Sequence, residues 1–162
     1  MNAPERFFLP DIQASADHRQ QAINKVGVTG LPYPLALFDG LGQVQHTVAE
    51  VSMAVGLSPE VKGTHMSRFI ELLEKKRPAL TLERLLRMLD EMLRRLDATS
   101  GTIELAFPYF ISKEAPISGV ESLLDYDVRL RAEKHAGLPA ELHMEIVAPV
   151  TSLCPCSKKI SD

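Results

Sequence analysis

Residues 81–107, TLERLLRMLDEMLRRLDATSGTIELAF, decide the fold class, because the spacing of their apolar residues changes from helical to strand-like. Thr81 is a helix-capping residue type, and Glu83 follows in the first turn. The leucines of this segment fall on one face of a helix and the charged residues largely on the other. From residue 102 polar and apolar residues alternate, which is typical of a half-buried strand.

The flanking sequence repeats both patterns. A second helix is predicted from about Thr64 to the residues before Pro78, with apolar residues three and four apart. Alternating or short apolar runs predict the strands, which are 35–38, 44–57, 103–107, 126–133 and a final strand that contains 142–146 and ends at Cys154. Each strand except the first has one polar face. We therefore expect an α+β protein in which two helices pack on one face of an antiparallel sheet, in the order β-β-α-α-β-β plus a final strand.

Composition and charge narrow the class of protein. The chain has 162 residues, 45% of them hydrophobic and 24% charged, as in a globular protein with a substantial core. Its formal net charge is −3, so no basic field indicates nucleic-acid binding. No apolar run reaches the ~20 residues of a membrane span, and residues 1–6 lack a signal-peptide core. We expect a cytoplasmic protein with an N-terminal arm, 1–30, and one domain, 31–162.

The two cysteines, Cys154 and Cys156, flank one proline near the end of the sequence. A disulfide between them would close a small, strained ring. Thiols in this arrangement serve as metal ligands, nucleophiles or redox groups in cytosolic proteins, and the alternative is two buried structural thiols. A catalytic zinc site needs three protein ligands. The residues that could complete such a site are His65, His143 and either Glu141 or Glu145.

The segment 62–68, KGTHMSR, could bind an anion at the start of its helix. Gly63 allows close approach of the backbone, Thr64 and Ser67 carry hydroxyl donors, and Lys62 and Arg68 are positively charged. The alternative is an ordinary helix start with solvated charges. A third segment, 115–127, is interpreted as a loop that leads into an amphipathic strand.

Three segments, taken in order, resemble GTP cyclohydrolase type IB, the bacterial metal-dependent form of GTP cyclohydrolase I. They are KGTHMSRF at 62–69, PISGVESLLDYD at 116–127 and PVTSLCPCSK at 149–158. The resemblance spans Asp17 to Asp162. It implies a tunnelling fold, in which sheet-and-helix-pair modules assemble into barrels, and a homotetramer.

The resemblance also implies a reaction and a site. GTP would be hydrolysed to 7,8-dihydroneopterin triphosphate and formate, the first step of folate biosynthesis, by a water activated on a divalent metal (zinc, manganese or iron). Cys154 matches the metal-binding cysteine of the family, and His65 and Arg68 are candidate substrate-binding residues. The family's companion ligands, a histidine and a glutamate, would follow residue 162. We therefore expect this sequence to be the N-terminal module, with the second module absent.

Two other functions remain as alternatives. One is a non-catalytic metal- or partner-binding module, in which Cys154 and Cys156 form a local chelate. The other is a relative with a cysteine nucleophile, such as a nitrile reductase, which would form a covalent adduct at one thiol.

Overall fold

The computed structural model describes residues 21–38, 42–75, 78–114, 118–150 and 152. These residues form five strands and two helices. In chain order they are β1 (Ile23–Phe38), β2 (Val44–Leu57), α1 (Met66–Glu74), α2 (Leu82–Arg95), β3 (Gly101–Glu114), β4 (Glu121–Lys134) and β5 (Ala140–Val147).

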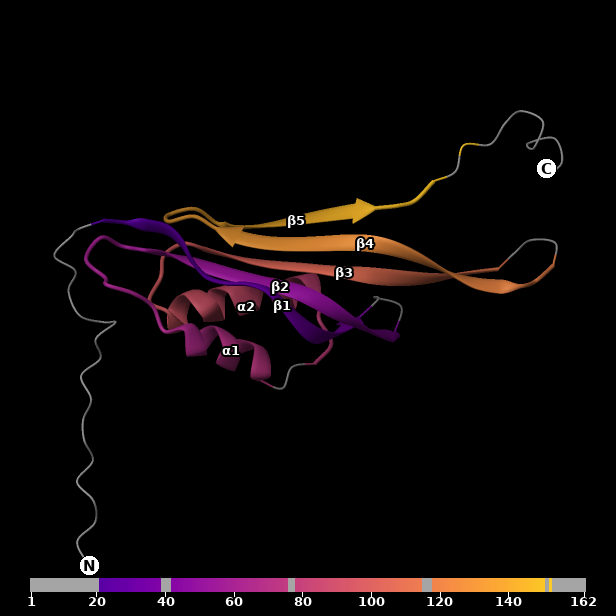
Figure 1. Ribbon diagram of the computed structural model, residues 1–162, viewed down its shortest axis with the longest axis horizontal. Coiled ribbons are helices and arrows are strands. Elements are labelled where there is room, and N and C mark those ends of the chain that lie inside the picture. Colours follow the sequence, from indigo (N-terminus) through magenta and orange to yellow (C-terminus); the bar gives the residue numbers. More distant parts are fainter. Residues whose placement is uncertain (1–20, 39–41, 76–77, 115–117, 151, 153–162) are drawn as a thin grey trace, which may run out of the picture.

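The strands form one antiparallel sheet in the order β1-β2-β3-β4-β5, and each strand pairs with its neighbours in sequence. Both helices lie on the same face of this sheet (Figure 1). The prediction of an α+β fold with an antiparallel sheet and two helices on one face is confirmed. We call the face under the helices the helix side and the opposite face the open side.

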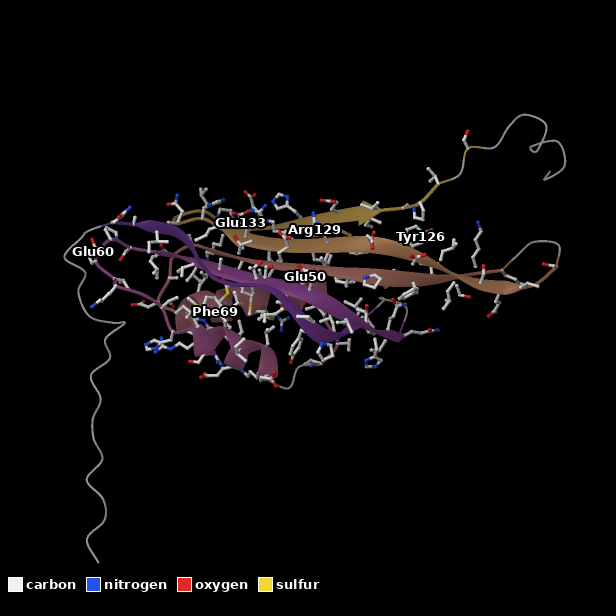
Figure 2. The ribbon with its side chains drawn as sticks, in the orientation of Figure 1. Glu50, Glu60, Phe69, Tyr126, Arg129 and Glu133 are labelled. Carbon is white, nitrogen blue, oxygen red and sulfur yellow. The ribbon has the colours of Figure 1, made fainter. Side chains whose placement is uncertain are left out.

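The core lies between the helices and the middle strands. Phe69 of α1, Leu89 of α2 and Ile103 of β3 are each fully buried in it. Figure 2 shows Phe69 on the helix side of the sheet. In β2 every second residue from Ala49 to Leu57 is buried, because successive side chains of a strand point to opposite faces. The strand predicted over 44–57 from alternating apolar residues is therefore confirmed, and it buries one of its two faces.

The first strand is longer than the sequence predicted. β1 begins at Ile23, so residues 23–30 belong to the sheet and their assignment to an N-terminal arm is wrong. The physical reason is that two register shifts break the alternation, and Gly30, with φ of +68°, lies within the second. Gly27 packs so close to β2 that a Cβ there would lie 1.9 Å from the carbonyl oxygen of Met53. Residues 1–20 of the expected arm lie outside the described residues.

The last strand is shorter than predicted. β5 ends at Val147, and Ala148–Val150 are not in a strand, so the expectation that this strand ends at Cys154 is wrong. Pro149 has no amide hydrogen to donate to a neighbouring strand, which accounts for the end of the ladder. The strands predicted at 103–107 and 126–133 also extend further, to β3 and β4.

The two helices follow their predicted signals. The Thr81 hydroxyl accepts a hydrogen bond from the Arg84 amide at 3.2 Å, which confirms it as the cap of α2. α1 starts at Met66, two residues after the predicted start. Among the described residues, no helix has the length and apolar character needed to cross a membrane.

β3 and β4 continue beyond the rest of the sheet. β2 pairs with β3 only up to Ala106, and β5 pairs with β4 only from Asp127 onwards. Beyond these residues β3 and β4 pair with each other alone, and in Figure 1 they run on past the end of β5 and away from the helices. We call this two-stranded ribbon, Tyr109–Glu114 with Glu121–Tyr126, the β3–β4 arm.

Candidate functional site

The KGTHMSRF segment forms the start of α1 and is anchored in the core. Thr64 is buried, and Phe69 is fully buried. His65 is the N-cap residue; its carbonyl oxygen accepts from the Arg68 amide at 3.1 Å, and its side chain is half-buried and does not cap the helix. The backbone of this segment is therefore held by its own turn and by apolar packing.

Arg68 joins the two helices. Its Nη1 donates a hydrogen bond of 2.9 Å to the carbonyl oxygen of Arg95, the last residue of α2. Carbonyl groups at a helix C-terminus have no partner within the helix and carry partial negative charge, so a cation is favourable there. The structure thus gives Arg68 a partner in the fold, and its contact with a substrate stays a prediction.

Of the two cations considered for an anion site at the start of α1, Arg68 is already hydrogen-bonded to the Arg95 carbonyl oxygen. Arg68 is directed to α2, and Lys62 is exposed. The arrangement supports the alternative of an ordinary helix start, in which one charge is structural and the other solvated.

The cysteine motif itself, Cys154 and Cys156, lies outside the described residues. The described chain leads to it from the end of β5, where Val147 pairs with Asp127 of β4. The side chain of Val150 is 90% exposed, so the described chain leaves the sheet before the motif.

The companion ligands considered for a metal do not gather in the described part of the chain. His143 and Glu141 lie two residues apart on β5, with the His143 Nε2 and a Glu141 oxygen 3.4 Å apart, and both side chains are exposed. His65 belongs to α1. No three side chains among the described His, Cys, Asp and Glu residues form a group that could hold a metal ion.

A ladder of charges crosses the open side of the sheet. The guanidinium of Arg129 on β4 lies 3.5 Å from a carboxylate oxygen of Glu104 on β3 and 3.6 Å from one of Glu145 on β5. Further along β4, Arg131 pairs with Glu133 at 2.6 Å. Figure 2 shows Arg129 and Glu133 on the side of the sheet away from the helices. Sequence reasoning missed this ladder, because only the strand register brings the three strands' charges together.

These pairs are largely exposed, and pairs of that kind contribute about 0–1 kcal/mol each to stability. Arg131 differs, because its Nε is buried without a hydrogen-bond partner among the described residues. Glu60, labelled in Figure 2, has its pKa lowered chiefly by a hydrogen bond to the Ser58 side chain. That carboxyl is fully exposed, so its shift indicates a turn contact and no reaction centre.

A cavity of about 600 Å³ lies between the first two strands and the two helices. The Tyr33 hydroxyl on its wall donates to the Leu73 carbonyl oxygen at 2.7 Å. Lys75 and Pro78, on either side of residues 76–77, also line it. Because those two residues lie outside the described part of the chain, we assign no ligand to this cavity.

The described residues define a class of protein: an α+β fold with one antiparallel sheet and a helix pair on one face, followed in the sequence by a cysteine motif. A family model described as type I GTP cyclohydrolase FolE2 matches residues 9–162. The chain belongs to this family.

Individual relatives agree with the family model. The chain is 64% identical to the GTP cyclohydrolase FolE2 1 of Dechloromonas aromatica over 100% of its length, and 53% identical to the GTP cyclohydrolase FolE2 of Azoarcus over 99%. The protein of that name from Aromatoleum aromaticum is 49% identical over 100% of the chain. The chain covers 61%, 60% and 60% of these relatives, and so spans about three fifths of their length.

Proposed function

We propose that this protein hydrolyses GTP to 7,8-dihydroneopterin triphosphate and formate, the first step of folate biosynthesis. The observation that carries the proposal is the family match over residues 9–162, together with 64% identity to a relative named as a GTP cyclohydrolase. The proposal concerns the whole enzyme, because the chain spans three fifths of the relatives' length.

Cys154 is the proposed metal ligand of the enzyme. The described residues do not fit a metal site by themselves, since no group of three potential ligands occurs among them. Cys154 would therefore bind the metal together with ligands that are not among the described residues. A divalent metal, whether zinc, manganese or iron, would supply a water of lowered pKa to the hydrolysis.

The remaining assignments follow from the same family membership. His65 and Arg68, at the start of α1, are proposed to face the substrate side of the assembled enzyme. The sheet from β1 onwards, with its helix pair, is proposed as the first tunnelling-fold module, and the enzyme as a cytoplasmic homotetramer.

The test is to incubate the purified protein with GTP and each of the three divalent metals, and to quantify formate and the pterin product. The proposal expects one formate and one pterin for each GTP consumed. Intact GTP under all three conditions, with one metal bound per chain and lost on substitution of either Cys154 or Cys156, would instead establish the metal-binding module.

A further inference from the structure

We draw no further inference here: the strongest candidate, the apolar groove of about 300 Å³ that β3, β4 and β5 form beside the start of α2, is an exposed surface for which nothing among the described residues shows what covers it.

Discussion

Arg68, in the segment that resembles the family's KGTHMSRF motif, makes a hydrogen bond that holds the two helices together. Its guanidinium bonds the carbonyl oxygen of Arg95, and the two residues are 27 positions apart in the sequence. One bond thus joins the first turn of α1 to the last turn of α2. Both helices lie on the sheet, so the bond fixes where the segment containing His65 stands relative to it.

We predict that Arg68→Ala lowers the free energy of unfolding by about 1.5 kcal/mol, the contribution of a partly buried hydrogen bond with a charged donor. Urea unfolding measures it. Arg94→Ala is the control: Arg94 makes a long, exposed bond of 3.4 Å to Asp90, and its loss should change stability by less than about 0.5 kcal/mol. Equal stability for Arg68→Ala and the native protein, with lost GTP turnover, would assign Arg68 to the substrate instead.

At the residue scale, the sequence could predict candidates but not their partners. Thr81 was predicted as a cap because its partner lies three residues away, and the bond to Arg84 is present. The partners of Arg68 and Arg129 lie on other elements, so only the fold brings them together. Cys154 lies outside the described residues, and its role as a metal ligand stays a prediction.

The side chain of Gln45 on β2 makes hydrogen bonds to the backbone of β3 where the two strands no longer pair. β2 and β3 stop pairing after Ala106, and Pro108 has no amide to continue the ladder. The Gln45 side chain donates to the Phe110 carbonyl oxygen at 2.8 Å and accepts from the Phe110 amide at 2.9 Å. The Thr47 hydroxyl donates to the Pro108 carbonyl oxygen at 3.0 Å. Side chains of β2 therefore close one edge of the β3–β4 arm at its base.

We predict that Gln45→Ala raises the hydrogen-exchange rate of the Phe110 amide about fivefold, because the loss of a bond worth about 1 kcal/mol opens the amide to water. Amide exchange followed by NMR or mass spectrometry measures it. Gln45→Glu keeps the acceptor and loses the donor, so it should protect the amide better than Ala does. Unchanged exchange in Gln45→Ala would show that this contact does not hold the arm.

Helices and strands were predicted correctly from the sequence where the spacing of apolar residues stays constant along the whole element. β2 matches its alternation at 44–57, and α2 matches its leucine face. The prediction was wrong where register shifts interrupt the period, as at Ile23–Leu31 of β1. It also fell short in β3, which was predicted over 103–107 and continues to Glu114; Pro108 is tolerated there because β2 no longer pairs with β3 at that point.

At the scale of the whole molecule, the sheet order follows the chain order, and the helix pair between β2 and β3 covers one face only. The sequence therefore predicted the layers, because local patterns and short connections determine them. It did not predict which apolar residues of the helix side are exposed, since the same apolar alternation marks buried and exposed parts of a strand. Met144 and Ile146 share the pattern of a core strand and are about half exposed.

We have proposed that the whole enzyme is a metal-dependent GTP cyclohydrolase and that Cys154 binds its metal. This proposal is tested most directly by the rate of dihydroneopterin triphosphate formation with saturating metal, in the native protein, Cys154→Ala and Cys156→Ala. We expect at least a 100-fold loss of kcat/KM in Cys154→Ala, because loss of a residue that only supports a metal ligand already costs about 10–100-fold. Cys156→Ala should lose much less. Full activity in Cys154→Ala would contradict the proposal.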